Sequence, residues 1–457
     1  MRNQEFQQFI DKVKGKKVGV VGLGVSNLPL ISFLLGFGAE VYGFDQREIS
    51  SLPEQVHEMK GEVSLYLGKD YLNHLKGMDL IFKTPGMRRD EPRLLEAEKA
   101  GAEITSEMEE FLTYCPGRTI GVTGSDGKTT TTTVIGEILK QAGHKVYVGG
   151  NIGNPLLTKV LEITSSDFVV LELSSFQLMT MDVSPEISVV TNLSPNHLDM
   201  HKDMDEYILA KKNIFLHQEE SDLLILNEDN AITKSFAKEA KGEVVFFSSI
   251  KENEDAYFRE GSLYIREERI VDLEEMKVKG IHNAENFLAA FLATEQFVSK
   301  SILREVAISF NGVKHRCQLI RELDGVKYYN DSIASSPTRT LASIGSLDRK
   351  VNIILGGYDK KLDYTSLAEE GHQFIKNAIL VGDTKLKIQD VFKVYAQNEG
   401  VVVKTYLAES FEEAVDLLRS VSEEGDIAIL SPASASFDMF RNFEERGDKF
   451  VALVNNF

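Results

Sequence analysis

The stretch Gly121-Val-Thr-Gly124-Ser-Asp-Gly127-Lys128-Thr129-Thr130 indicates a phosphate-binding loop between a strand and a helix. Residues 118–122 before it are β-branched and strand-like, and residues 132–141 after it have a helical pattern. A glycine-rich turn at such a junction directs several backbone N–H groups at one point, to which the helix dipole adds positive potential. The ammonium of Lys128 and the metal-binding hydroxyl of Thr129 complete a site for a nucleoside triphosphate.

The loop departs from the usual pattern G-x-x-x-x-G-K-[ST], which would place glycine where this chain has Val122. The form present is the compact T-G-x-x-G-K-T-T. The alternative is a structural glycine turn that happens to hold a lysine. Strand, glycine spacing, lysine, threonine and helix all agree with the phosphate-binding loop, so we expect phosphate and metal contacts from residues Gly124, Ser125, Asp126, Gly127, Lys128, Thr129 and Thr130.

Bulk composition limits the partners of the chain. The 457 residues exceed one ordinary core and predict two to four domains. A formal net charge of −19 makes nucleic acid or an anionic membrane surface an unsuitable partner. The cysteines, Cys115 and Cys317, give no disulfide framework and suit a reducing cytosol. The polar N-terminus and the absence of any 18-residue apolar run predict a cytoplasmic protein with no membrane span.

Strand-like and helical stretches alternate throughout, which predicts an α/β protein with parallel sheets. Near the start, residues 17–21 form a predicted strand, 28–36 a helix and 40–45 a second strand that ends in an acid. This is half of a dinucleotide fingerprint, but its third glycine position holds Asn27. We therefore expect a Rossmann-like fold with only a weak signal for a nicotinamide cofactor, and a dehydrogenase is kept as an alternative.

Two further α/β units follow. The predicted domains are 1–107, a central domain at 108–312 that holds the phosphate loop, and 313–457. In the last domain, the predicted strands 325–331, 350–357, 378–382 and 427–431 each end in Gly, Asp or Ser. In open α/β sheets, ligands bind at the carboxyl ends of strands.

Several residues of the central domain are candidates for the site. Glu172 closes a buried-looking strand 43 residues after Thr129, where an acid holds the metal or orients water; the alternative is an exposed strand-end carboxylate. His197 also follows a strand, and either a ligand role or a structural one fits it. Lys211 and Lys212 lie on a predicted helix at 205–215, and spacing alone favours a solvated basic face.

Polar residues near and beyond the central domain have two interpretations each. Arg316 matches a γ-phosphate bidentately or lies on the surface. Asp331 and Lys360 follow strands, where a ribose or second substrate would bind. Asn283 and Asn286 share one face of a helix start, where they read adenine or act as caps.

Taken together, these segments resemble the Mur ligases, the ATP-dependent amide ligases of peptidoglycan precursor synthesis. The matching segments are 123–130, 172–177, 192–199, 282–286, 312–316 and 330–332. Within the family, segments 431–447 and 149–153 and the short N-terminal domain are similar to the branch that adds D-glutamate to UDP-N-acetylmuramoyl-L-alanine. Folylpolyglutamate synthases share the central fold and mechanism.

The resemblance implies three α/β domains: a Rossmann-like N-terminal domain, a central P-loop domain and a Rossmann-like C-terminal domain. It implies catalytic roles for Lys128, His197, Lys211 and Arg316. The UDP part would bind to Ser26, Asp45, Arg47, Thr84 and Gly86, and the muramoyl-alanyl part to Asn151. Two Mg²⁺ ions would bind to Thr129, Glu172, His197 and Lys211, the last as a carbamate, which offers the oxygen ligands that Mg²⁺ prefers.

For the remaining ligands, the resemblance implies that Asn283 and Asn286 lie near adenine and that Arg316 and Asp331 close over ATP. The D-glutamate pocket would be formed by Ser335, Lys360, Ser436, Phe437 and Phe443. Some relatives have lysine where this chain has Ile333, threonine in place of Ser335, and a short hydroxyl residue in place of Gln46.

The chemistry implied is phosphorylation of the L-alanyl carboxylate by ATP and attack of the D-glutamate amine on the acyl phosphate. We expect a monomer. The alternatives are a Mur ligase that adds another amino acid, a folylpolyglutamate synthase, and a P-loop nucleotide switch without ligase activity.

Overall fold

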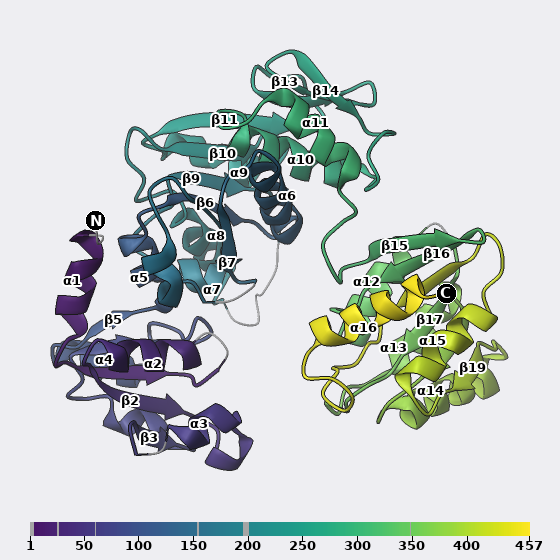
Figure 1. Ribbon diagram of the computed structural model, residues 1–457, viewed down its shortest axis with the longest axis horizontal. Helices are drawn as coiled ribbons and strands as arrows, with labels where there is room; N and C mark the ends of the chain where they lie inside the picture. The colour runs from purple at the N-terminus through teal and green to yellow at the C-terminus, as the bar shows by residue number, and fades with distance from the viewer. Residues whose placement is uncertain (1–3, 25–26, 60, 153–154, 195–200, 348) are drawn as a thin grey trace. The chain divides into compact units, whose positions relative to one another are not determined.

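Figure 1 shows the computed structural model of the protein, which describes residues 4–24, 27–59, 61–152, 155–194, 201–347 and 349–457. The chain forms two compact units, residues 1–310 and 311–457. The first unit contains two β-sheets and the second contains one. Among the described residues, no helix combines the length and the apolar character that a bilayer crossing requires.

The first sheet has the strand order β3-β2-β1-β4-β5 with all pairings parallel. This order is that of a Rossmann sheet, as the sequence predicts. Parallel strands are buried on both faces, which explains the continuous apolar run of β1. The elements are α1 (Gln4–Val13), β1 (Lys17–Val21), α2 (Leu28–Gly36), β2 (Glu40–Asp45), α3 (Glu54–Glu58), β3 (Ser64–Leu67), β4 (Leu80–Phe82), α4 (Pro92–Lys99), β5 (Glu103–Thr105) and α5 (Glu107–Tyr114).

The second sheet carries the phosphate-binding loop. Its order is β14-β13-β12-β11-β10-β9-β6-β8-β7, with parallel pairing from β7 to β12 and antiparallel pairing beyond. Strand β6 lies between β8 and β9, so the chain order reverses beside it, where open α/β sheets bind their ligands. The strands are β6 (Arg118–Thr123), β7 (Val146–Gly150), β8 (Phe168–Glu172), β9 (Ile187–Val190), β10 (Leu223–Asn227), β11 (Glu243–Ser248), β12 (Ala256–Arg259), β13 (Ser262–Ile265) and β14 (Glu268–Asp272).

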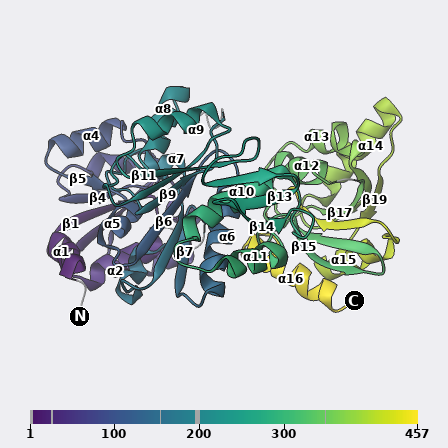
Figure 2. The same ribbon diagram turned by 90° about the horizontal axis from the view of Figure 1, so that it is seen from above.

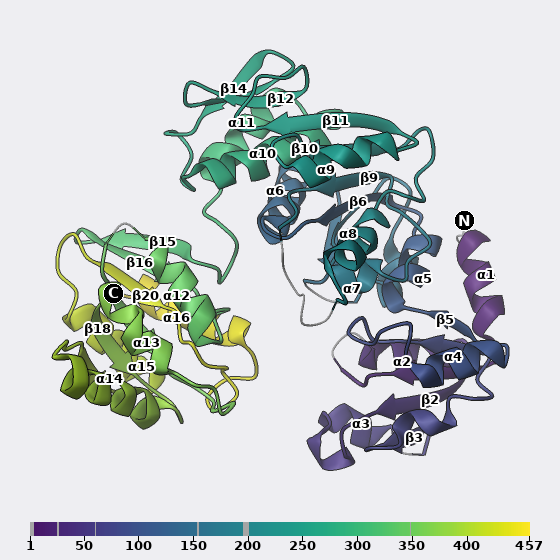
Figure 3. The ribbon, with the colours of Figure 1, turned by 180° about the vertical axis from the view of Figure 1, so that it is seen from behind.

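Helices cover this sheet. Figures 1 and 3 show α6 beside α10, and α7 beside α8. The helices are α6 (Lys128–Gln141), α7 (Ser175–Leu178), α8 (Met204–Lys212), α9 (Ala231–Ser235), α10 (Ile281–Thr294) and α11 (Lys300–Ser309). Helix α6 begins four residues earlier than the sequence pattern predicts, because Gly127 at φ 80° caps it directly after the loop. Helix α10 ends at Thr294.

The second unit has the sheet order β15-β16-β20-β17-β18-β19, with an antiparallel pair β15–β16 at one edge. Along β17, Ile353 and Leu355 belong to one apolar core and Ile354 to another, so helices cover both faces. Figure 2 shows α12–α14 and α15–α16 on opposite sides of β17. The elements are β15 (Gln318–Leu323), β16 (Val326–Asn330), α12 (Pro337–Gly345), β17 (Val351–Leu355), α13 (Thr365–Glu369), β18 (Ile375–Leu380), α14 (Lys385–Glu399), β19 (Lys404–Leu407), α15 (Phe411–Ser420), β20 (Ile427–Leu430) and α16 (Phe443–Asn455).

These three sheets with their crossover helices confirm the predicted fold class.

Candidate active site

The phosphate-binding loop begins where β6 ends, at Thr123. A Cβ atom on Gly124 would lie 1.9 Å from the hydroxyl of Thr191, so only glycine fits there, at φ 146°. Asn192 supports the turn, because its backbone oxygen accepts from the Ser125 N–H at 2.8 Å and its side-chain oxygen from the Asp126 N–H at 2.9 Å. The usual first glycine is unnecessary here, because Val122 still belongs to the strand.

Lys128 lies across this loop and donates to the carbonyl oxygens of Gly124 and Ser125 at 2.9 and 2.8 Å. Its ammonium therefore lies against the backbone of the phosphate-binding loop, which leads directly into the N-terminus of α6. An anion bound to that helix N-terminus would meet both the helix dipole and a full positive charge.

Asn286 and Asn283 have different surroundings, although they share a helix. Buried Asn286 accepts from the Thr131 hydroxyl at 3.2 Å, and a Cβ on Gly127 would lie 2.2 Å from its oxygen. The structure thus brings Asn286 against the phosphate loop. Half-buried Asn283 donates to the backbone oxygen of Lys279 at 2.7 Å, as a cap would.

Glu172 ends β8 beside the loop, and its side chain is 2% exposed. Asn151 donates to its Oε1 at 2.7 Å, and the Asn151 backbone N–H donates to the Glu172 carbonyl at 2.7 Å. Among the described residues, Oε2 has no hydrogen-bond donor. A buried carboxylate oxygen without a donor is costly unless a cation or water occupies that position.

Lys211 points inward from α8 and is 2% exposed. Its Nζ lies 2.9 Å from the Thr123 hydroxyl and 2.7 Å from the Gly124 carbonyl oxygen. Burial, and secondarily the charge of Lys128, lower its pKa well below the usual value, because both disfavour the ammonium. The expectation of a solvated basic face is therefore wrong for Lys211; its neighbour Lys212 pairs with Glu239 at 2.5 Å instead.

The donors of this region suit a hard cation. The open oxygen of Glu172 and the hydroxyl of Thr129, buried in the first turn of α6, are oxygen donors of the kind that Mg²⁺ takes. A group of three or more His, Cys, Asp or Glu side chains able to hold a metal is absent from the described ranges. His197, expected as a ligand, lies outside the described residues. A complete metal site from acidic and imidazole ligands is therefore not formed by the described residues alone.

In the N-terminal domain, an open groove of about 930 Å³ lies at the carboxyl ends of the first sheet. Four of the predicted UDP-binding residues line it: Asp45, Arg47, Thr84 and Gly86. Sequence reasoning missed Tyr71 and Arg88, which also line it. Arg88 follows the Thr84-Pro-Gly turn, so its place just after a strand was the available signal. Ser26 lies outside the described residues.

Asp45 holds the loops that border this groove. Its carboxylate accepts from the Leu23 backbone N–H at 2.8 Å and from the Arg47 guanidinium at 2.8 and 2.9 Å. Burial opposes ionisation, but these bonds outweigh it and lower the pKa of Asp45. Asn27, at the missing third glycine, donates to the carbonyls of Val21 and Gly22 at 3.0 Å, which ties the turn to its strand.

In the second unit, buried Asp331 accepts from the Cys317 N–H at 3.0 Å and from the Ser431 hydroxyl at 2.6 Å. Burial raises the pKa of this carboxyl. One carboxylate oxygen thus holds the segment after Arg316 and the other holds Ser431, which follows β20. The side chain of Arg316 itself is exposed.

The residues predicted for D-glutamate also lie in this unit. Phe437 is 59% exposed; its ring packs 5.9 Å from that of Tyr358 and 5.5 Å from the Lys360 ammonium. Ser436 beside it is buried, Ser335 is half-buried, and Phe443 opens α16. Sequence reasoning missed Arg446, which is fully buried and donates to the carbonyls of residues 332, 434 and 435.

Known proteins match the whole length of this chain. A profile of the Mur ligase MurD-like N-terminal domain matches residues 16–106, one of the Mur ligase middle domain residues 122–294, and one of the Mur ligase glutamate ligase domain residues 315–434. A UDP-N-acetylmuramoylalanine–D-glutamate ligase of Clostridium perfringens is 55% identical over 456 residues, 99% of both chains. The ligase of that name from Clostridium beijerinckii is 53% identical over 99% of each.

Solved structures agree at the level of the fold. A UDP-N-acetylmuramate-alanine ligase from Thermotoga maritima has a TM-score of 0.55 at 19% identity and covers 96% of this chain and 99% of its own. A MurF structure from Acinetobacter baumannii has a TM-score of 0.56 at 17% identity, with 96% and 91% covered. With three domain profiles in order and full-length relatives above 50% identity, this chain belongs to the Mur ligase family.

Proposed function

We propose that this protein is the ATP-dependent ligase that joins D-glutamate to UDP-N-acetylmuramoyl-L-alanine in cytoplasmic peptidoglycan precursor synthesis. The observation that carries this proposal is 55% identity over 99% of the chain to a ligase named for that reaction. The geometry agrees, because the phosphate loop, Glu172 and Lys211 gather at the end of β6. We further infer that the protein works as a monomer.

The reaction needs an activated carboxylate, because a free carboxylate has no good leaving group. The γ-phosphoryl group of ATP passes to the L-alanyl carboxylate and gives an acyl phosphate and ADP. Lys128 and the N–H groups of α6 hold the transferring phosphate oxygens and neutralise charge that develops on them. Mg²⁺, when bound by Thr129, Glu172 and the carbamate of Lys211 with His197, supplies further charge neutralisation.

Lys211 reaches its working form by modification. A neutral amine is required for addition of CO₂, and the lowered pKa of Lys211 favours that form. Once the ammonium has lost a proton, the nitrogen lone pair of the neutral amine forms the C–N bond to CO₂. One of the two remaining N–H protons leaves to solvent, and the other stays on the carbamate nitrogen. The product carries one negative charge on two oxygens in place of a cation.

The amine of D-glutamate then attacks the acyl carbon, phosphate leaves, and a proton must be taken from the nitrogen. His197 is the proposed acceptor of that proton. For recognition of D-glutamate we propose the Lys360 ammonium and the hydroxyls of Ser335 and Ser436, with Phe437 and Phe443 as apolar walls. Arg316 and Asp331 are proposed to act on ATP, Asn283 and Asn286 beside adenine, and Asn151 on the muramoyl-alanyl part.

The experiment is phosphate release from ATP, measured with UDP-N-acetylmuramoyl-L-alanine and a panel of D- and L-amino acids. We expect release only when both the UDP substrate and D-glutamate are present. Release with L-lysine or another amino acid would identify a different Mur ligase. That ligase is the second candidate, because Ile333 stands where some relatives have a lysine near D-glutamate. Release without either substrate would indicate a nucleotide switch, and dependence on a folate would indicate the folylpolyglutamate reaction.

A further inference from the structure

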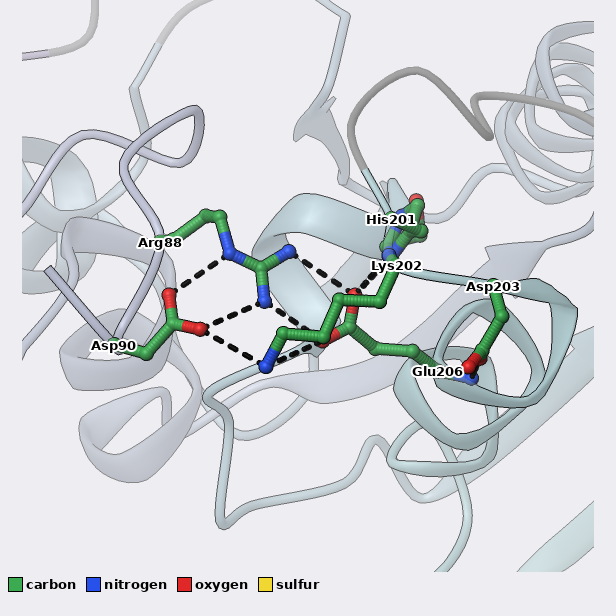
Figure 4. A network of polar contacts seen from close by, with 7 residues as sticks. Arg88, Asp90, His201, Lys202, Asp203 and Glu206 are labelled. Atoms are coloured by element: carbon green, nitrogen blue, oxygen red, sulfur yellow. Dashed lines mark hydrogen bonds and ion pairs between the residues drawn. The ribbon is translucent and has the colours of Figure 1, made fainter.

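A network of alternating charges joins the N-terminal domain to helix α8, as Figure 4 shows. Arg88 donates to Asp90 through Nε and Nη2 at 2.8 and 3.0 Å, and to Glu206 through Nη1 and Nη2 at 3.0 and 2.7 Å. The Lys202 ammonium lies 3.1 Å from Asp90 and 3.9 Å from Glu206. Each of the two carboxylates thus accepts two hydrogen bonds from the one guanidinium. Such bidentate pairing fixes the relative orientation of arginine and carboxylate.

Glu206 is the point at which this network enters the central domain. It lies in the first turn of α8, where its own N–H donates to the N-cap Asp203 at 2.8 Å. Its carboxylate also accepts from the Lys202 backbone N–H at 2.8 Å. Glu206 is 22% exposed and Arg88 28%, so water screens the pair only in part.

The same helix reaches the phosphate loop within two turns. Tyr207, next to Glu206, shares a hydrogen bond of 3.0 Å with the Ser125 hydroxyl. Lys211, one turn later, contacts Thr123 and the loop carbonyl beside it. A shift of α8 at Glu206 would therefore move the residues that contact the loop.

At its other end, the network borders the open groove of the N-terminal domain. Arg88 and Asp90 both line that groove, whereas Glu206 does not. We propose that Arg88 and Glu206 are positioning residues that couple the UDP groove of the N-terminal domain to the ATP site of the central domain. This inference rests on the proposed function of the groove as the site of the UDP part.

The coupling has a direct physical basis. Arg88 lines the groove while it donates two hydrogen bonds to Glu206, so a ligand that contacts Arg88 in this orientation stabilises the Arg88–Glu206 pair. The pair in turn fixes the first turn of α8 and, through it, Tyr207 and Lys211. By linkage, a ligand in the groove and a nucleotide on the loop must then change each other's affinity by the same factor.

The test is calorimetric titration with UDP and with ADP, separately and together, on the full-length protein and its variants. In Glu206→Gln, which removes charge outside the groove, we expect UDP to bind about tenfold more weakly, or about 1.4 kcal/mol. In the parent, saturating UDP should tighten ADP binding by about fivefold. That factor should fall to about one in Glu206→Gln and in Arg88→Met.

Two controls are a double variant that exchanges the charges of Arg88 and Glu206, and variants of an unrelated ion pair in the same domain. The double variant R88E/E206R restores a cation–anion pair in reverse and should recover part of the factor. Arg93→Met and Glu96→Gln break an exposed pair of the N-terminal domain, 2.8 Å apart, and should keep the parent's factor. Melting temperatures of all variants are measured alongside, because a purely structural role would lower stability and leave the UDP–ADP factor unchanged.

Unchanged UDP affinity in Glu206→Gln, or the parent's factor in both single variants, would overturn the coupling. Failure of the proposed function looks different: the parent itself would then bind no UDP or make no D-glutamate product. A parent that ligates D-glutamate and variants that match it would refute the coupling and leave the function intact.

Discussion

The ammonium nitrogen of Lys211 lies 2.7 Å from the carbonyl oxygen of Gly124, the first glycine of the phosphate-binding loop. Burial and the nearby charge of Lys128 both disfavour its protonated form. Helix α8 therefore brings a lysine with a lowered pKa to the phosphate-binding loop, whereas Lys212 pairs with Glu239.

We predict that Lys211→Ala lowers kcat by about 100-fold or more, equivalent to about 2.7 kcal/mol of barrier, because the carbamate oxygens are lost. Added acetate or formate should restore part of the activity by filling the vacant ligand position. Lys212→Ala is the matched control and should stay active. A dead Lys212→Ala beside a healthy Lys211→Ala would reverse the assignment, and full activity in both would refute the carbamate.

Replacement of Lys128 by alanine should abolish ATP turnover while the fold survives, because the positive charge at the phosphate-binding loop is removed. Turnover and a melting curve are the measurements. Lys140→Ala, at the exposed end of the same helix and 3.1 Å from Glu137, should behave like the parent. A Lys128→Ala variant within about tenfold of parent turnover, or about 1.4 kcal/mol, is incompatible with our assignment of the loop.

Lys360→Ala and Ser436→Ala should raise the KM for D-glutamate, each removing a donor for a carboxylate. Truncation of one partner of a buried charge pair costs about 2–5 kcal/mol, with the lower end fitting the exposed Lys360. The KM for ATP is the internal control and should change little. Unaltered D-glutamate KM in both variants would remove these residues from the pocket.

Glu107→Gln should change how stability depends on pH. Burial raises the pKa of Glu107 to about 7 from 4.5, although it accepts from the Leu156 and Leu157 N–H groups at 2.8 and 2.7 Å. The folded state therefore binds a proton between pH 4.5 and 7 that the unfolded state lacks, and the parent's unfolding free energy falls as pH rises through that window.

Glutamine keeps the acceptor and cannot ionise. Relative to the parent, the variant should gain about 1–3 kcal/mol of unfolding free energy between pH 4.5 and 8. Denaturant unfolding at several pH values measures this, and the difference between the two proteins isolates Glu107 from Glu109, whose pKa burial also raises to about 7. A difference that does not vary with pH would show that Glu107 is ionised throughout.

Local sequence patterns predicted the helices and strands well where residues close in the sequence determine their bounds. The strand at 17–21, the helix at 28–36 and the strand at 40–45 have the predicted bounds, because apolar runs and turn residues define them. The start of α6 was missed, since a left-handed Gly127 allows the helix to begin at once after the loop.

Contacts between segments that are distant in the sequence could not be predicted from local patterns. Asn151 meets Glu172 across 21 residues and Arg88 meets Glu206 across 118, and only the stacking of strands and domains brings them together. Burial of Lys211 depends likewise on its contacts with Thr123 and Gly124, some 87 residues earlier in the chain, so its spacing alone suggested a solvated face. Family resemblance, and not spacing, supplied its assignment as a metal ligand.

We propose that ATP activates the L-alanyl carboxylate as an acyl phosphate before D-glutamate attacks. The most direct test of this proposal is mass spectrometry of the products formed from UDP-N-acetylmuramoyl-L-alanine with both carboxylate oxygens labelled as ¹⁸O. We predict that the released phosphate carries one ¹⁸O and the D-glutamyl amide product keeps the other. Unlabelled phosphate, or ATP consumption without the amide product, would contradict the account.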